Sequence, residues 1–76
     1  MKSYTLKDIT AFSPRTSFTI GRSTRQFEYI GVVTEPNAPF SHTIAVLYDS
    51  KAQKYTVVDL LHDKRADATI NIIYHY

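Results

Sequence analysis

The sequence contains no cysteine. A chain without thiols forms neither a disulfide nor a thiolate zinc site, so zinc fingers and small disulfide-stapled secreted modules are excluded. Tryptophan is also absent, and the only two glycines, Gly21 and Gly31, are far apart in the chain. Their separation excludes a glycine-rich loop of the kind that cradles a phosphate.

Long apolar runs are absent too. No stretch approaches the roughly 20 apolar residues that a membrane-spanning helix needs. The N-terminal segment, MKSYTLKDITAF, mixes charges with single apolar residues and lacks the apolar centre of a secretory signal peptide. We therefore expect a cytoplasmic protein that does not engage a membrane.

The size and charge of the chain set further limits. A chain of 76 residues suits one small domain, 1–76, near the lower limit for a self-sufficient core. The net charge of +2 is unevenly placed, because residues 1–27 carry +4 and residues 28–76 carry −2. The basic N-terminal third would suit a phosphate backbone or an acidic protein surface, and it is equally consistent with scattered solvated charge.

The most apolar and most β-branched stretch is 43–61, TIAVLYDSKAQKYTVVDLL, which has a polar break in its middle. This pattern predicts a β-hairpin with a loop at 50–53. In this register Asp49 faces Lys54 and Tyr48 faces Tyr55, which gives an opposite-charge pair and an aromatic pair across the strands. The loop has no glycine, so we expect four residues around a type I turn.

Alternation divides this hairpin into two faces. One face carries Ile44, Val46, Tyr48, Tyr55 and Val57, and the other carries Ala45, Leu47, Val58 and Leu60. Both faces are apolar. We therefore expect the strand pair to be covered on both sides, by the rest of the chain or by a partner.

A helix at about 51–64 is the alternative for the second half of the hairpin. Ser50 followed by Gln53 matches a capping box, and apolar residues further on share one helical stripe. Three successive β-branched residues, Thr56–Val58, oppose this alternative, because they lose rotamer freedom in a helix. The strand is the favoured prediction.

The remaining segments also read as strands. We expect them within 1–12, 16–22, 26–35 and 69–76, with a proline-rich loop at 35–41 and a charged connection at 62–67. The first of these segments is ambiguous, because Leu6, Ile9 and Phe12 have helical spacing while Tyr4 and Leu6 alternate as in a strand. In the third segment, Phe27, Tyr29 and Val33 are expected to share a face with Gly31, where another backbone or ring would approach closely. The fold class predicted is mainly β, a small antiparallel sheet or barrel of five to six short strands, with α+β as the alternative.

Catalytic chemistry has little support in the sequence. No serine or threonine lies in a nucleophile elbow. His62, Asp63, Asp67 and His75 match no metal-ligand spacing, and a chain this small seldom supplies an active-site cleft. We expect no enzyme activity, no catalytic residue, no metal and no cofactor.

Three segments resemble the forkhead-associated phosphothreonine-binding domain: FTIGR at 18–22, SH at 41–42 and YTVVDL at 55–60. The resemblance covers about a third of the chain. It implies that Arg22 and Ser41 contact a phosphate and that His42 supports the loop. In this sequence the serine and histidine are adjacent, and no Asn-Gly step follows Asp59-Leu60.

Tyrosine and arginine are the candidate binding residues. The chain has six tyrosines and four phenylalanines, more rings than so small a core buries completely. The expected binding residues are Arg22, Arg25, Tyr29, Tyr74 and Tyr76. Exposed tyrosine with arginine is typical of protein interfaces and of single-strand nucleic-acid platforms.

These observations favour a small non-enzymatic protein-binding module, an inhibitor or adaptor that uses a Tyr/Arg-bearing sheet face or edge. The alternatives are a nucleic-acid-binding small β-barrel and a phosphopeptide-binding module like the forkhead-associated domain. Two apolar hairpin faces and a tyrosine-rich terminal strand also predict a homodimer or an obligate partner.

Overall fold

The computed structural model describes residues 3–34 and 43–74 of the chain. The elements in chain order are β1 (Tyr4–Thr5), the 3-10 helix η1 (Leu6–Ala11), β2 (Ser17–Ile20), β3 (Gln26–Thr34), β4 (Thr43–Asp49), β5 (Lys54–Asp59), the 3-10 helix η2 (Lys64–Asp67) and β6 (Thr69–Tyr74). None of the helices in the described part is long and apolar enough to cross a membrane. The loop expected at 35–41 lies outside the described residues.

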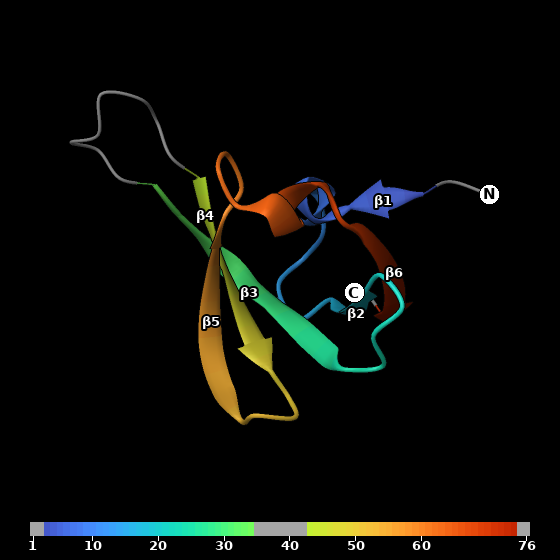
Figure 1. Cartoon of the computed structure of the whole chain (residues 1–76). Helices are drawn as coiled ribbons and strands as arrows, with labels where there is room; N and C mark the ends of the chain where they lie inside the picture. The colour runs from blue at the N-terminus through green and yellow to red at the C-terminus, as the bar shows by residue number, and fades with distance from the viewer. Residues whose placement is uncertain (1–2, 35–42, 75–76) are drawn as a thin grey trace.

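The strands form one antiparallel sheet of six, in the order β1-β6-β2-β3-β4-β5 (Figure 1). The mainly-β prediction is confirmed, and the sheet does not close into a barrel. The C-terminal strand β6 lies between β1 and β2, so the two ends of the chain help to build one side of the sheet. Strands β1 and β5 are the two edges.

The β4–β5 hairpin has the predicted register. Asp49 pairs with Lys54, and Tyr48 pairs with Tyr55, whose ring lies 5.1 Å from the Tyr48 ring in an edge-to-face arrangement. The loop is four residues long and is closed by the Gln53 N–H, which donates to the Asp49 carbonyl at 2.8 Å. The helix considered at about 51–64 is therefore wrong, because β-branched side chains pair well across strands.

The strand predicted over 1–12 is mostly wrong. Only Tyr4–Thr5 is extended, and Leu6–Ala11 forms the 3-10 helix η1. Its start is stabilised by Asp8, whose carboxylate accepts a hydrogen bond from the Thr5 N–H at 2.8 Å. A 3-10 helix repeats every three residues, so Leu6 and Ile9 both point into the core, where both are fully buried.

The core lies on the inner face of the curved sheet. Its buried members are Leu6, Ile9, Phe18, Tyr29, Ala45, Leu47, Val58, Leu60, Ala66 and Ile70. The two 3-10 helices cover this face, and the Lys7 ammonium joins them by an ion pair with Asp67 at 3.0 Å. The hairpin face that carries Ala45 and Leu47 is therefore the covered one.

Two β-bulges change which face several side chains occupy. On β3 the pairing passes from Tyr29–Leu47 to Gly31–Val46, so Ile30 is the extra residue. A one-residue shift moves every later side chain to the opposite face. Gly31 and Val33 consequently lie on the outer face, which corrects the prediction that they share a face with Tyr29.

The close approach predicted at Gly31 is also wrong. A Cβ atom built on Gly31 would meet no heavy atom within 4 Å. The second bulge is on β6, where Ile72 pairs with Phe18 and Tyr74 pairs with Ser17, leaving Ile73 as the extra residue. Tyr74 therefore leaves the core face that Ile72 occupies.

Candidate interaction surface

The outer face of β3, β4 and β5 carries a continuous set of apolar side chains, called the outer patch below. Its members are Val33, Ile44, Val46, Tyr48, Tyr55 and Val57. Tyr55, Val57 and Val33 are 65%, 57% and 52% exposed, and the other three are half-buried. Large contiguous apolar surface is uncommon on a monomer and indicates an interaction site.

Among residues 3–34 and 43–74 nothing covers the outer patch, because η1 and η2 lie on the other side of the sheet. The hairpin was expected to be covered on both faces, yet the described residues cover one. The β-branched and aromatic residues that pair across β4 and β5 therefore reach solvent on the outer face.

A shallow cleft of about 460 Å³ adjoins the outer patch, and Arg15 lines it beside Glu28, Tyr48 and Tyr55. Arg15 follows Pro14 in a turn that the Thr16 N–H closes by donating to the Ser13 carbonyl at 3.2 Å. Arg15 has a φ of 74°, a left-handed conformation that glycine normally occupies. The turn holds a cation at the border of the apolar surface.

Four cations gather at one end of the sheet, called the basic end below. Arg22 and Arg25 belong to the β2–β3 turn, and Lys51 and Lys54 belong to the β4–β5 loop and the start of β5. In Figure 1 the β4–β5 loop lies at the bottom and the β2–β3 turn at the lower right, and the Ser50 N–H joins these two connections by donating to the Gln26 carbonyl at 3.2 Å. The fold thus places two lysines at the same end of the sheet as the two arginines that were predicted to bind.

The acid among these cations is Asp49, which is only 5% exposed. Its Oδ1 accepts hydrogen bonds from the backbone N–H groups of Lys51 and Ala52 at 3.0 and 3.1 Å. Its Oδ2 contacts Nη1 of Arg25 at 3.3 Å. Asp49 therefore shapes the loop and anchors Arg25, and all four cations of this end are exposed.

Tyr29 does not join Arg22 and Arg25 on the surface. It is 4% exposed, and its burial raises the pKa of the phenol above the usual 10.0. Its backbone N–H donates to the Thr16 carbonyl at 2.9 Å, which holds β3 against the segment before β2. The ring is part of the core.

Tyr74 is exposed, at 55% of its surface, on β6. Its partner Ser17 pairs in turn with Glu28, and Glu28 pairs with Tyr48. Tyr74 thus begins a row of side chains that crosses the outer face and reaches Tyr48. Tyr76 lies outside the described residues.

The phosphate-binding set implied by the forkhead-associated resemblance is only partly placed. Arg22 lies in the exposed β2–β3 turn. Ser41 and His42 lie outside the described residues, so that set stays a prediction.

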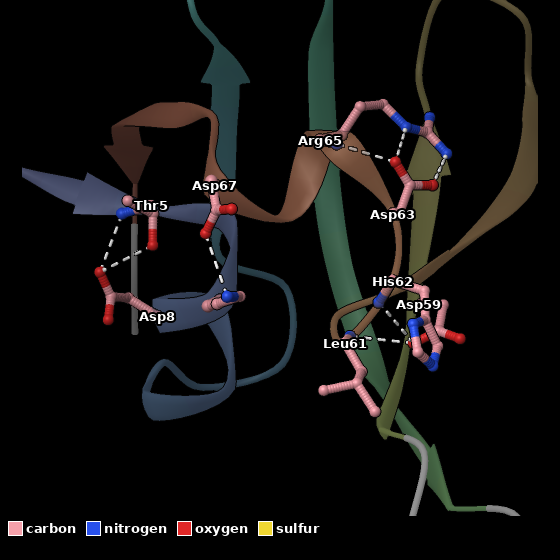
Figure 2. A network of polar contacts seen from close by, with 9 residues as sticks. Thr5, Asp8, Asp59, Leu61, His62, Asp63, Arg65 and Asp67 are labelled. Atoms are coloured by element: carbon pink, nitrogen blue, oxygen red, sulfur yellow. Dashed lines mark hydrogen bonds and ion pairs between the residues drawn. The ribbon is translucent and has the colours of Figure 1, made fainter.

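The acidic residues near the other end of the sheet serve local backbone structure (Figure 2). The Asp59 carboxylate accepts from the N–H groups of Leu61 and His62 at 2.9 and 3.3 Å. Asp63 accepts from the Arg65 N–H at 2.8 Å and from its Nη2 at 2.9 Å. These hydrogen bonds lower the pKa of Asp63 from 3.8 to about 2.

In the described part of the chain, no three His, Cys, Asp or Glu side chains gather around one point where they could hold a metal ion. Asp63 caps η2 and Asp67 pairs with Lys7, so each has a structural partner. His75 lies outside the described residues.

The outer patch was not among the residues predicted to bind. Its signal was present in the sequence, because both hairpin faces are apolar and a chain of 76 residues has little material to cover both. Alternation identified the two faces but did not indicate which of them the remaining chain would cover.

The chain was compared with known proteins at three levels. No protein-family model matches it, and no match was found among curated proteins or among solved structures.

Proposed function

We propose that this protein is a small non-enzymatic binding module, of the inhibitor or adaptor type, that docks another protein on the outer patch. The observation that carries the proposal is the exposure of Tyr55, Val57 and Val33 on a face that no described element covers. Fully burying such a side chain is worth about 1.5–3 kcal/mol, and more than half of the surface of each of these three is still exposed. Each would then contribute about 1 kcal/mol to binding.

The partner's surface is expected to be apolar at its centre and acidic at one border. Arg15 supports this, because it lines the cleft beside Tyr48 and Tyr55 at the border of the outer patch. Rim charges of this kind act mainly on the association rate and on partner choice. The partner would therefore be captured faster at low salt, while its affinity would depend chiefly on the apolar contact.

The test compares two lysine substitutions at similarly exposed aliphatic residues of different strands. Val57 on β5 and Ile73 on β6 are 57% and 51% exposed, so both variants should fold. Binding partners are captured from a lysate with wild type, Val57→Lys and Ile73→Lys, and the bound protein is then purified and titrated. The Val57→Lys variant should weaken the purified complex at least about tenfold, and Ile73→Lys should leave it unchanged.

Equal affinity of wild type and Val57→Lys for the purified partner would refute docking on the outer patch. Circular dichroism and thermal unfolding of both variants serve as the folding control. Adding a second substitution, Tyr55→Ala, extends the test to the aromatic member of the patch.

Nucleic-acid binding is the second candidate, supported by Arg15, a cation that lines the same cleft as the exposed Tyr55 ring. Such a surface would stack bases and contact phosphates. A labelled single-stranded oligonucleotide is titrated with the protein at several salt concentrations. Affinity that falls steeply with salt, and partner capture lost after nuclease treatment, would favour this candidate over protein binding.

A further inference from the structure

The two edges of the sheet are very different. Strand β1 is two residues long, whereas β5 runs for six residues, Lys54–Asp59. Natural sheets protect a long edge with a proline, a bulge, a central charge or a covering segment. In β5 the charges are at the two ends, the pairing with β4 is regular, and among the described residues no element lies along its outer side (Figure 1).

The pairing with β4 shows which backbone groups of β5 face outward. The Leu60 N–H donates to the Thr43 carbonyl at 2.9 Å, which makes Thr43–Leu60 a hydrogen-bonded pair. Such pairs alternate along an antiparallel ladder, so Thr56 bonds to Leu47. The N–H and C=O groups of Tyr55 and Val57 therefore point away from β4, toward the open edge.

The carbonyl of Asp59 also points outward, but it accepts the Asp63 N–H at 2.9 Å within the same chain. The open ladder consists of Tyr55 and Val57. These two residues offer two donors and two acceptors, the set that an identical strand running in the opposite direction would satisfy.

We propose that β5 pairs antiparallel with β5 of a second copy of this chain, about a two-fold axis at Thr56. In this register Tyr55 of each copy faces Val57 of the other, and four backbone hydrogen bonds form. The side-chain pairs are aromatic with β-branched on the outer face and threonine with threonine on the inner face, both favourable across strands.

The charges at the two ends of β5 favour the antiparallel direction over the parallel one. Strand β5 begins with Lys54 and ends with Asp59. In this register Lys54 faces Val58 and Asp59 faces Gln53 of the other copy, so no like charges meet, whereas parallel pairing in register would place Lys54 opposite Lys54 and Asp59 opposite Asp59. The two-fold axis also closes the assembly, because both long edges are consumed and only the two-residue β1 edges remain outside.

The dimer joins two outer patches on one side of a continuous sheet. An axis perpendicular to the sheet keeps both outer faces on the same side. The partner proposed above would then meet two patches, which raises its apparent affinity when it is itself multivalent. The dimer proposal does not depend on that partner, because the dimer is tested with the free protein alone.

Hydrogen exchange of the wild-type protein, measured by NMR at increasing concentration, tests the pairing directly. In the monomer the amides of Tyr55 and Val57 face water, while the Thr56 amide bonds to Leu47 and serves as an internal control. As the dimer forms, exchange at Tyr55 and Val57 should slow by at least about tenfold, with Thr56 protected throughout. A sedimentation series gives the mass over the same concentration range.

A cysteine substitution provides the second measurement, because the native chain has no cysteine. Thr56→Cys places two Cβ atoms about 4.5–5.5 Å apart across the axis, close enough for a disulfide after small adjustment. Ile73→Cys, on β6, is the exposed control. Thr56→Cys should form covalent dimers much faster than Ile73→Cys under mild oxidation.

Two results would overturn the proposal. One is a monomeric mass at every concentration together with equal disulfide rates for the two cysteine variants. The other is a dimer in which the Tyr55 and Val57 amides still exchange freely, since that dimer would use another surface. Neither result bears on whether Val57→Lys weakens partner binding, so the two proposals fail separately.

Discussion

The Asp49 carboxylate and the Arg25 guanidinium link the two connections at the basic end, with Oδ2 and Nη1 3.3 Å apart. The Asp49 side chain is 7% exposed and the Arg25 side chain is 45% exposed. The carboxylate also accepts two backbone N–H groups of the β4–β5 loop. One buried acid therefore sets the shape of the loop and the position of an arginine from a different turn.

Replacing Asp49 should destabilise the protein in proportion to the hydrogen bonds that are lost. Asp49→Ala removes the acceptor of two loop amides and the partner of Arg25, and should cost about 1–3 kcal/mol. Asp49→Asn keeps one carbonyl oxygen for the loop amides and should cost less. Urea denaturation of the two variants measures the difference, and equal losses would show that the charge, and not the loop contact, dominates.

The two arginines of the β2–β3 turn should differ in their effect on stability. Arg25→Ala removes the cation beside the buried Asp49 carboxylate and should cost about 1 kcal/mol. Arg22, in the same turn, is exposed and serves as the matched control, so Arg22→Ala should stay within about 0.5 kcal/mol of wild type. Thermal or urea unfolding measures the stability of both variants, and equal stability of Arg25→Ala and Arg22→Ala would contradict the prediction.

The two glycines should respond to alanine with opposite signs. Gly21 has a φ of 58°, so Gly21→Ala forces a left-handed alanine and should cost about 1 kcal/mol. Gly31 lies inside β3, where a Cβ atom would meet nothing within 4 Å. Gly31→Ala should therefore raise the free energy of unfolding by about 0.5–1 kcal/mol through the entropy of the unfolded chain. A loss of stability in Gly31→Ala would contradict this prediction, because it would mean that the added Cβ atom meets a neighbouring group.

The β4–β5 loop offers a similar comparison with glycine as the new residue. Gln53 has a φ of 56°, a conformation that costs a side chain about 1 kcal/mol. Gln53→Gly should stabilise the protein by a few tenths to about 1 kcal/mol. Ala52→Gly, at the neighbouring exposed residue, should destabilise it instead, because it only increases the entropy of the unfolded chain. Differential scanning calorimetry measures whether each substitution raises or lowers the stability of the protein.

Acid should remove the contribution of the Asp63–Arg65 contact. The pKa of Asp63 is about 2 in the folded chain against an ordinary 3.8, because hydrogen bonds from Arg65 favour the charged carboxylate. A depressed folded pKa stabilises the protein above the unfolded pKa, and this stabilisation is lost as pH falls from about 5 to 2. The difference in unfolding free energy between wild type and Asp63→Asn should shrink over that range. A difference in unfolding free energy that stays constant with pH would contradict the contact. At neutral pH, added salt should reduce this difference, because the Asp63–Arg65 pair faces solvent.

Local chemistry in the sequence determined the hairpin. The polar break, the Asp49–Lys54 and Tyr48–Tyr55 pairs and three successive β-branched residues all favour one register, and the structure has that register. These are interactions between near neighbours in the chain, so alternation and side-chain type are enough to predict them. The mainly-β class follows from the same pattern repeated along the chain.

The faces occupied by the later residues of β3 and β6 were not predictable in this way. Bulges at Ile30 and Ile73 move Val33 and Tyr74 to the outer face, and nothing in the alternation marks where an extra residue enters. A bulge depends on how the neighbouring strand is bonded, which involves residues distant in sequence. Leu6 and Ile9, three residues apart, likewise lie on the 3-10 helix η1, and both are buried in the core.

The choice between the two apolar faces of the hairpin was made by tertiary structure alone. Ala45 and Val58 carry the same alternation signal as Val46 and Val57, but η1, η2 and the inner residues of β2 and β6 fill the space beneath the first pair only. A chain of this length has too little apolar surface to cover both faces. The sequence therefore determined that the hairpin has two apolar faces, and the packing of distant segments decided which one remains exposed in the described part of the chain.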